Sequence, residues 1–502
     1  MPSPLYIAVD LGAGSGRVFL ARCDPDDFLL EEVHRFTYPP YFDGRFLRWN
    51  FGLIFDEVVA GLRLAGTRAA FLGSPIESIG VDSWGVDYGL VDTDGRLVGD
   101  PVCYRDSRTD DAMTRVFSIV PRAEIFENTG IQFQKFNTLY QLFSESSENK
   151  DASMLLLLPD LINFMLSGNA IAEYTNATTT QMVNAATKDW DADLIDRLQL
   201  PRQLLKDIVP AGTMLGTLRP ELADKTGLND VNVIAPGTHD TASAVATIPL
   251  DEGSAYISSG TWSLIGIERD APLVTPEAAQ LNFTNEGGVY NTFRFLKNVM
   301  GLWIFECCRR EWETDGKSIG YETLITDAEA IDGYPAFIFP DDEGFLNPES
   351  MLKAINNQLA ATGQPTEREP SVITKIIFDS LAFRYASVLR SIGSLTNSNL
   401  ARIEIVGGGG RNRYLNQSTA NATGLSVRTG LTEATVVGNV LVQAIASGRF
   451  ESLSAARSYV ASKIEVENFI PRTVPGLAEA EARYLAIEER FETQLPVRMT
   501  AK

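Results

Sequence analysis

Hydrophobic residues along this chain gather in short apolar runs that alternate with Ala-rich or amphipathic segments. Residues 5–9, 76–81 and 231–235 are runs of strand length, and each is followed by polar residues and glycine. Runs of this kind are typical of buried strands. Residues 241–247 are Ala-rich, and residues 373–392 repeat apolar positions at helical spacing, with Gly393 suited to the helix end. The pattern predicts an α/β fold.

Other segments are assigned by the same criteria. Residues 154–166 are predicted as one buried helix and residues 222–230 as a loop. Residues 294–303 are predicted to lead from a strand into a helix, with Asn298 near the helix start. Residues 476–495 are predicted to form a charged amphipathic helix at the end of the chain.

Two segments with small residues at their centres are predicted to form β-hairpins. In residues 5–21 the sequence Asp-Leu-Gly-Ala-Gly-Ser-Gly-Arg separates two runs of strand-forming residues, and residues 254–267 repeat this arrangement. The first segment also resembles the glycine loops of methyltransferases and dinucleotide-binding proteins. Both of those loops need a helix after the glycines, and the spacing here is G-x-G-x-G. Two similar domains, each with a phosphate-binding turn, would clamp a nucleotide; two unrelated hairpins are the alternative.

Length and composition limit the classes of function. The 502 residues are too many for one compact core, which predicts two domains, residues 1–248 and 249–502. A net charge of -22 argues against nucleic acid and against anionic membrane surfaces. The two histidines and four cysteines lack metal-ligand spacing, so a zinc centre is not expected. We expect a cytoplasmic protein without a secretory signal, either monomeric or homodimeric.

Asp240 is the leading candidate for catalysis. It lies between a predicted strand and a predicted helix, where a helix N-cap is expected, and the helix dipole there favours an ionised carboxylate. Such a carboxylate can accept a proton from an attacking hydroxyl in phosphoryl transfer. An ordinary N-cap is the alternative. Trp84 and Gly85 form a candidate carbohydrate contact or a core tryptophan beside a turn, and the four glycines at 407–410 permit close contact with a planar ring.

Together these segments resemble the FGGY family of carbohydrate kinases over nearly the whole chain. The matching segments are Val-Asp-Leu-Gly-Ala with Ser-Gly-Arg at residues 9–17, Ile-Gly-Val-Asp-Ser-Trp-Gly-Val-Asp at 79–87, Tyr-Arg-Asp-Ser-Arg-Thr at 104–109, Glu-Tyr-Thr-Asn-Ala-Thr-Thr-Thr-Gln at 173–181, His-Asp-Thr-Ala-Ser-Ala-Val at 239–245, Ser-Ser-Gly-Thr-Trp-Ser-Leu at 258–264 and Leu-Lys-Asn at 296–298.

The resemblance implies two actin/hexokinase-like (ribonuclease H-like) domains with a central cleft. It also implies transfer of the γ-phosphoryl group of ATP, with Mg²⁺, to the 1-hydroxyl of a ketose, for which L-rhamnulose or a close 6-deoxyketose such as L-fuculose is expected. Asp240 would be the base, and Asp10 would lie beside Mg²⁺ and hold it through water. The implied ATP contacts are Ala13, Gly14, Ser15, Gly16, Arg17, Thr261, Glu306 and Gly408. The implied sugar contacts are Trp84, Gly85, His239, Asp240, Thr241 and Asn298.

One position near the nucleotide departs from the family pattern. The most similar family members have Gln where this chain has Glu306. Two other functions are kept as alternatives. An S-adenosylmethionine methyltransferase would use the first glycine turn alone, and an actin-like assembly protein would bind ATP without a sugar. A Walker loop is absent, since Glu311 stands where Gly316-Lys317-Ser318 would need its upstream glycine.

Overall fold

The computed structural model describes residues 3–145 and 151–492. The chain forms two compact units that are interleaved in sequence. Unit 1 contains residues 1–249, 268–295 and 433–464, and unit 2 contains residues 250–267, 296–432 and 465–502. The domain boundary expected after residue 248 stays a prediction. Within the described ranges, no helix combines the length and apolar character needed to cross a bilayer.

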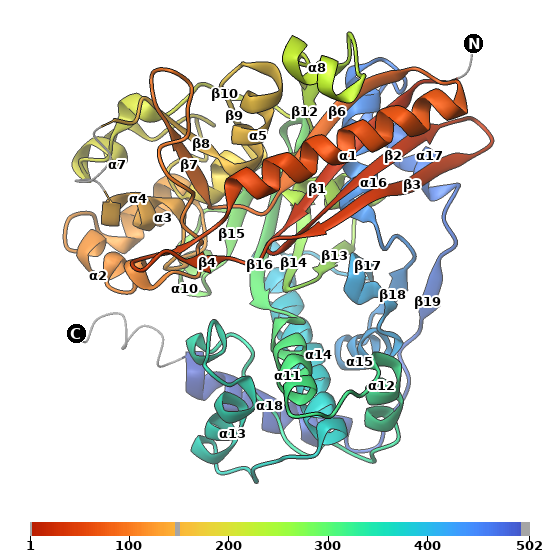
Figure 1. Ribbon diagram of the computed structural model, residues 1–502. Coiled ribbons are helices and arrows are strands. Elements are labelled where there is room, and N and C mark those ends of the chain that lie inside the picture. The colour runs from red at the N-terminus through yellow and green to blue at the C-terminus, as the bar shows by residue number, and fades with distance from the viewer. Residues whose placement is uncertain (1–2, 146–150, 493–502) are drawn as a thin grey trace. The chain divides into compact units, whose positions relative to one another are not determined.

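Unit 1 is built on a six-stranded mixed sheet (Figure 1). In spatial order its strands are β11 (Thr213–Thr217), β12 (Asn232–Ala235), β6 (Ile76–Ser83), β1 (Leu5–Gly12), β2 (Ser15–Cys23) and β3 (Phe28–Thr37). β12, β6 and β1 run parallel, and β1 turns back into antiparallel β2. The carboxyl ends of the three parallel strands therefore meet at one edge of the sheet, where ligands of open α/β sheets bind.

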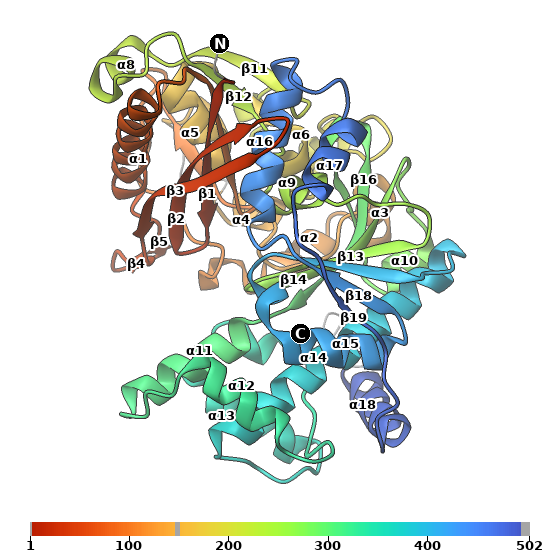
Figure 2. The ribbon, with the colours of Figure 1, turned by 90° about the vertical axis from the view of Figure 1, so that its right-hand side faces the viewer.

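Helices cover both faces of this sheet (Figure 2). On one face Gly61 of α1 (Phe51–Leu72) allows close approach, because a Cβ at that position would lie 2.4 Å from Val18. On the other face α16 (Ala434–Ala446) packs against the next residue of β2, Phe19. Successive residues of a strand point to opposite faces, so Val18 and Phe19 direct the two helices to opposite sides.

The rest of unit 1 consists of shorter elements. Its small two-stranded sheets pair β4 (Tyr41–Phe42) with β5 (Leu47–Arg48), β7 (Tyr88–Val91) with β8 (Met154–Leu157), and β9 (Ala172–Glu173) with β10 (Ile208–Val209). The remaining strand is β15 (Thr284–Gly287). The helices are α2 (Ala112–Phe117), α3 (Arg122–Thr129), α4 (Thr138–Glu145), α5 (Leu158–Ser167), α6 (Tyr174–Ala177), α7 (Ala192–Arg197), α8 (Pro220–Thr226), α9 (Asp240–Ala246), α10 (Pro276–Gln280) and α17 (Leu453–Ala461).

Unit 2 has its own sheet. Its strands follow the order β16 (Phe293–Met300), β14 (Trp262–Arg269), β13 (Ser254–Ser259), β17 (Arg402–Val406), β18 (Ser426–Thr429) and β19 (Glu467–Phe469). Its helices are α11 (Trp303–Thr314), α12 (Tyr321–Glu329), α13 (Met351–Ala361), α14 (Pro370–Thr396), α15 (Arg413–Thr423) and α18 (Leu477–Glu492). The aromatic rings of Phe337, Phe383 and Tyr484 pack together and join α18 to α14.

Both predicted hairpins are confirmed. β1 and β2 pair antiparallel across a turn at Ala13 and Gly14, and β13 and β14 pair antiparallel across a turn at Gly260 and Thr261. Neither glycine turn leads into a helix. The first hairpin therefore lacks the strand–turn–helix arrangement that a methyltransferase or dinucleotide loop requires.

Several predicted elements are wrong in extent or type. Residues 154–157 form β8, which pairs with β7, so the predicted helix begins only at Leu158. Residues 220–226 form α8 where a loop was predicted from residue 222. α14 continues through Gly393 and ends at Thr396, and the next residue, Asn397, has the left-handed backbone that terminates helices. The predicted C-terminal helix is present as α18, and residues 493–495 of that prediction lie outside the described residues.

Candidate active site

The turn between β12 and α9 carries the predicted base. It lies beside the end of β6, because the backbone N–H of Ser83 donates to the carbonyl oxygen of Thr238 at 2.9 Å. The prediction that Asp240 is the helix N-cap is wrong: His239 occupies the N-cap position, and Asp240 is the first residue of α9. The Asp240 carboxylate still lies in the first helical turn, where the helix dipole favours negative charge.

The Asp240 carboxyl is both accessible and basic. Its side chain is 31% exposed, and its Oδ1 accepts a hydrogen bond from the Thr241 hydroxyl at 3.0 Å. Burial raises the pKa of this carboxyl, His239 opposes the rise, and the charge of Asp10 adds to it. A raised pKa strengthens a carboxylate as a proton acceptor, as a general base requires.

Asp10 and Asp82 form an acidic pair at the carboxyl ends of β1 and β6. They lie opposite each other in the parallel register of the two strands. Asp10 is paired with Arg17, whereas Asp82 is fully buried and accepts a hydrogen bond from Nδ2 of Asn439 at 2.5 Å. Burial, followed by the charge of Asp10, raises the pKa of Asp82 well above its usual value. Oδ1 of Asp82 has no hydrogen-bond partner among the described residues.

The first hairpin turn presents the predicted phosphate contacts. Ala13 and Ser15 are exposed, and Gly14 has a φ of +134°, which favours glycine. The Tyr38 hydroxyl lies 2.7 Å from the carbonyl oxygen of Gly12 and 3.0 Å from that of Ser15, so it fixes both ends of the turn. Gly16 is buried against Phe36, with no room for a Cβ, so it supports the turn from the core side.

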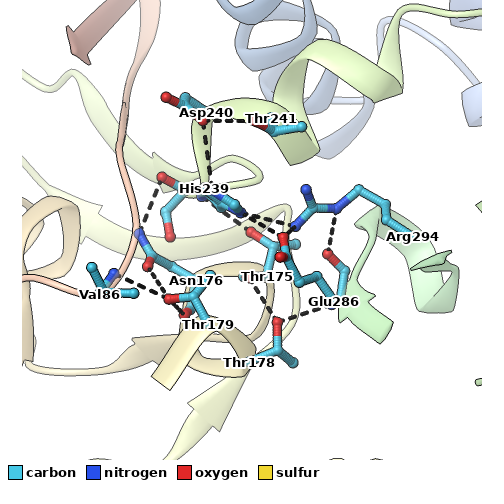
Figure 3. Close-up of polar contacts among 12 residues, drawn as sticks. Val86, Thr175, Asn176, Thr178, Thr179, His239, Asp240, Thr241, Glu286 and Arg294 are labelled. Carbon is cyan, nitrogen blue, oxygen red and sulfur yellow. Dashed lines mark hydrogen bonds and ion pairs between the residues drawn. The ribbon is translucent and has the colours of Figure 1, made fainter. Parts of the chain in front are cut away.

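His239 belongs to a charged cluster in unit 1 (Figure 3). Nη2 of Arg294 lies 2.9 Å from Nδ1 of His239 and 3.2 Å from Oε2 of Glu286. Nε2 of His239 faces Asp240 Oδ1 at 3.6 Å. Arg294 is fully buried, and Glu286 is nearly so. Sequence reasoning missed both partners, because Glu286 and Arg294 follow His239 by 47 and 55 residues and lie on β15 and β16.

A third missed residue, Glu173, anchors the catalytic turn. Its carboxylate accepts hydrogen bonds from the backbone N–H and the hydroxyl of Thr238, at 3.0 and 2.9 Å, and from the backbone N–H and hydroxyl of Thr175. The Thr175 hydroxyl in turn accepts from the backbone N–H of His239 at 3.2 Å. The only signal in the sequence was the 173–181 segment of the resemblance.

Trp84 and Gly85 are held more tightly than a sugar contact alone would require. Trp84 is 7% exposed, and its indole N–H donates to Asp87 Oδ2 at 3.0 Å. A Cβ on Gly85 would lie 2.9 Å from the Thr179 hydroxyl oxygen. Val86 has a φ of 70°, which is a strained value for a β-branched residue, and its N–H donates to Thr179 Oγ1 at 3.1 Å. This segment is therefore fixed from several sides.

The predicted nucleotide contacts of unit 2 lie on separate elements. Thr261 is exposed at the second hairpin turn, and Gly408 is exposed just after β17, with open space where a Cβ would be. Glu306 lies on α11 and pairs with Arg309 at 3.0 Å. Asn298 lies within β16, so its predicted place near a helix start is wrong.

Comparison with known proteins assigns these features to one family. Residues 5–247 match the N-terminal domain, and residues 255–447 the C-terminal domain, of the FGGY family of carbohydrate kinases. The chain belongs to the FGGY family. It is 40% identical over 474 residues to a rhamnulokinase of Oceanobacillus iheyensis, covering 94% of this chain and 99% of that protein. It is also 40% identical over 485 residues to a rhamnulokinase of Bacteroides thetaiotaomicron, covering 96% and 98%.

Solved structures share the FGGY kinase fold. Gluconate kinase from Lactobacillus acidophilus matches with a TM-score of 0.79 at 15% identity, over 100% of this chain and 99% of that one. Xylulose kinase from Rhodospirillum rubrum matches with a TM-score of 0.77 at 17% identity, over 98% and 99%. The predicted fold class is confirmed, and the chain is an ATP-dependent carbohydrate kinase.

An FGGY kinase uses ATP with a divalent metal ion, and the acidic pair fits such an ion. Asp82 offers a buried oxygen without a hydrogen-bond partner, directly beside Asp10. Within the described ranges, no three His, Cys, Asp or Glu residues are grouped to hold a metal alone. A site with one or two carboxylates suits an ion that keeps several waters and is completed by substrate phosphates.

Proposed function

We propose that this kinase transfers the γ-phosphoryl group of ATP to the 1-hydroxyl of L-rhamnulose, with Asp240 as the general base. One observation carries the catalytic part: an accessible carboxyl with a raised pKa lies at the start of α9, beside the ends of the parallel strands. The rhamnulokinase relatives, 40% identical over nearly their whole length, support the substrate. L-Fuculose is the alternative ketose.

In the proposed step, the oxygen of the ketose 1-hydroxyl forms a bond to the γ-phosphorus. The bond between that phosphorus and the bridging oxygen of ATP breaks, and ADP leaves. The hydroxyl proton passes to the Asp240 carboxylate, which later releases it to solvent through its exposed edge.

The metal ion of this reaction is proposed to be Mg²⁺. Bound with ATP, it supplies neutralisation of the phosphate charges. Asp10 would hold it through water, and the buried Asp82 would lie directly beside Asp10. Arg17, which pairs with both Asp10 and Glu433, keeps a positive charge at the phosphate turn.

The remaining contacts are proposed from the family pattern. His239, Thr241, Trp84, Gly85 and Asn298 would contact the ketose. The ATP contacts would be Ala13, Gly14, Ser15, Gly16, Arg17, Thr261, Glu306 and Gly408. A cytoplasmic location is part of the proposal, supported by four free cysteines. So is a monomeric or homodimeric state.

A coupled ADP-release assay tests the proposal. The purified chain is supplied with ATP, Mg²⁺ and, one at a time, L-rhamnulose, L-fuculose, xylulose, ribulose or glycerol. We expect the highest kcat/KM for L-rhamnulose. If glycerol or xylulose is preferred by a wide margin, the proposed substrate is wrong, and ADP release that no sugar stimulates would instead favour the actin-like alternative.

A further inference from the structure

His239 has a different charged partner on each side of its ring (Figure 3). On the Nδ1 side lie Arg294 Nη2 at 2.9 Å and Glu286 Oε2 at 3.4 Å. On the Nε2 side lies Asp240 Oδ1 at 3.6 Å, which is longer than a hydrogen bond. The contact with Arg294 is the shortest of the three. It therefore has the strongest influence on which ring nitrogen of His239 carries the proton.

The contact with Arg294 is compatible with a single neutral tautomer. A guanidinium only donates hydrogen bonds and does not lose its proton in proteins. Nδ1 of His239 must then be the acceptor, which leaves the ring proton on Nε2. An imidazolium would point an N–H at the guanidinium, and two donors would face each other with two positive charges.

We propose that Arg294 is a positioning residue that fixes His239 as the neutral imidazole with its proton on Nε2. That N–H then points to the side of Asp240 and donates to an oxygen of the bound ketose beside the reacting hydroxyl. The role in the reaction rests on the proposed function, whereas the tautomer itself is a property of the free protein.

The surroundings of Arg294 hold the guanidinium in this orientation. Its Nε donates to the carbonyl oxygen of Gly287 at 3.0 Å, and Glu286 pairs with Nη2 at 3.2 Å. The backbone N–H of Gly287 donates to the Thr178 hydroxyl at 2.9 Å, which ties this strand end to the segment after α6. The Arg294 side chain has no exposed surface, so these protein groups and not water hold the guanidinium.

The neutral His239 ring also leaves the pKa of the base, Asp240, raised. If His239 carried a positive charge, that charge would lower the pKa of Asp240 and oppose the effect of burial. With the ring held neutral, the Asp240 carboxylate keeps its basicity, and the Nε2–H orients the substrate without becoming a competing acid.

The tautomer can be read directly, because the chain has only two histidines. We would label histidine with ¹⁵N and record long-range ¹H–¹⁵N spectra of the full chain at pH 8, without ligands. A His34→Gln variant assigns the remaining signals to His239. We expect the pattern of a neutral ring protonated on Nε2. A ring protonated on Nδ1, or on both nitrogens, would overturn the proposal, whatever the substrate proves to be.

Variants then test whether Arg294 is the cause. Arg294→Met leaves Glu286 as the near partner of Nδ1, so we expect the His239 pattern to move toward protonation on Nδ1. We expect kcat/KM for the ketose to fall about 10- to 100-fold, by analogy with the loss of a partner that orients a metal-bound histidine, with the KM for ATP unchanged. Arg294→Lys keeps a donor and should recover part of both effects.

Arg457→Met is the matched control. Arg457 pairs with Glu268 at 2.9 Å and donates to carbonyls at the far end of α9, so this variant also removes a partly buried arginine from a glutamate in unit 1. It should leave the His239 pattern intact. Folded Arg294→Met that keeps the Nε2–H pattern would overturn the proposal. If Arg294→Met does not fold, the ¹⁵N spectra of the wild type and of Arg294→Lys test the proposal instead.

Discussion

At the scale of single residues, Asp87 holds Trp84, one of the proposed sugar contacts, in place. Its Oδ2 accepts hydrogen bonds from the indole N–H groups of Trp49 and Trp84, at 2.7 and 3.0 Å, and from the backbone N–H of Tyr104 at 3.2 Å. Burial raises the pKa of Asp87 to about 6, and the indole hydrogen bonds oppose the rise. An ionisable group thus positions the tryptophan.

This pKa predicts a pH dependence of stability. An unfolded aspartate ionises near pH 4, whereas Asp87 in the folded protein holds its proton until about pH 6. The folded state therefore binds more protons in this window, and the stabilisation that protonation gives is lost as pH rises from 4 to 6. Two pKa units correspond to roughly 3 kcal/mol. Between pH 4 and pH 6, the free energy of unfolding of the wild type should therefore fall by up to about that much relative to that of Asp87→Asn.

Thermal melting of both proteins at pH 4, 5, 6 and 7 measures the difference. Asp94→Asn, at an exposed aspartate, is the control. Melting curves of wild type and Asp87→Asn that shift in parallel with pH would show that Asp87 ionises as it does in the unfolded chain.

At the scale of elements, α6 holds the turn that leads into α9. Glu173 precedes α6 and accepts hydrogen bonds from Thr175 on that helix and from Thr238 in the turn. One buried carboxylate thus joins two segments 65 residues apart. Its hydrogen bonds to backbone N–H groups fix where His239 and Asp240 begin the helix.

Glu173→Gln should loosen this turn. The amide replaces one acceptor oxygen with a donor, which leaves buried N–H or O–H groups without an acceptor at a cost of about 1–3 kcal/mol. We expect a lower melting temperature and a lower kcat, with ATP binding by calorimetry retained. Thr226→Val is the control, because it removes a buried hydroxyl that bonds only within α8. Equal losses of kcat in the two folded variants would argue against a specific anchoring role.

The second hairpin allows a separate test of nucleotide binding. Thr261 is exposed at its turn, so Thr261→Val should not disturb packing. A lost hydrogen bond to a charged phosphate costs about 1.5–3 kcal/mol, which predicts a rise in the KM for ATP of about 10- to 100-fold. Ketose binding without nucleotide should be unchanged, and Thr261→Ser should resemble wild type. A comparable loss of ketose affinity in calorimetry would mean that Thr261 does not serve the nucleotide.

The sequence predicted the two hairpins, the strands before them and the turn at Asp240, because each combines a short apolar run with small or polar turn residues. It failed at residues 154–157, since a run of four apolar residues does not distinguish a strand from a buried helix. It also missed Glu286, Arg294 and the anchoring role of Glu173. Charged residues of this kind become part of a site only when distant segments pair, and no local pattern records that pairing.

At the scale of the whole molecule, the chain is an FGGY kinase of two compact units. The fold is shared with gluconate and xylulose kinases at 15–17% identity, so the fold does not select a sugar. Specificity must come from individual side chains around the proposed sugar contacts.

We predict measurable activity on L-fuculose, with L-rhamnulose preferred. L-Fuculose shares the terminal methyl group of L-rhamnulose, so a pocket that recognises this methyl group accepts both ketoses. A pocket separates substrates that differ by a small apolar group by only about 1–3 kcal/mol. Xylulose, which lacks that methyl group, should therefore be disfavoured by about 10- to 200-fold in kcat/KM. Equal kcat/KM values for xylulose and L-rhamnulose would show that the methyl group is not recognised.

The rate of ADP release by Asp240→Asn with saturating ATP and L-rhamnulose tests the central claim most directly. Asparagine keeps the size of the side chain and its ability to accept from Thr241, so the variant should fold and still bind the ketose in calorimetry. It cannot take the hydroxyl proton, and a positioned base contributes about 10²–10⁴-fold in rate. We therefore predict a fall in turnover by about that factor. A folded variant that retains more than about a tenth of wild-type turnover would contradict the role of Asp240 as the base.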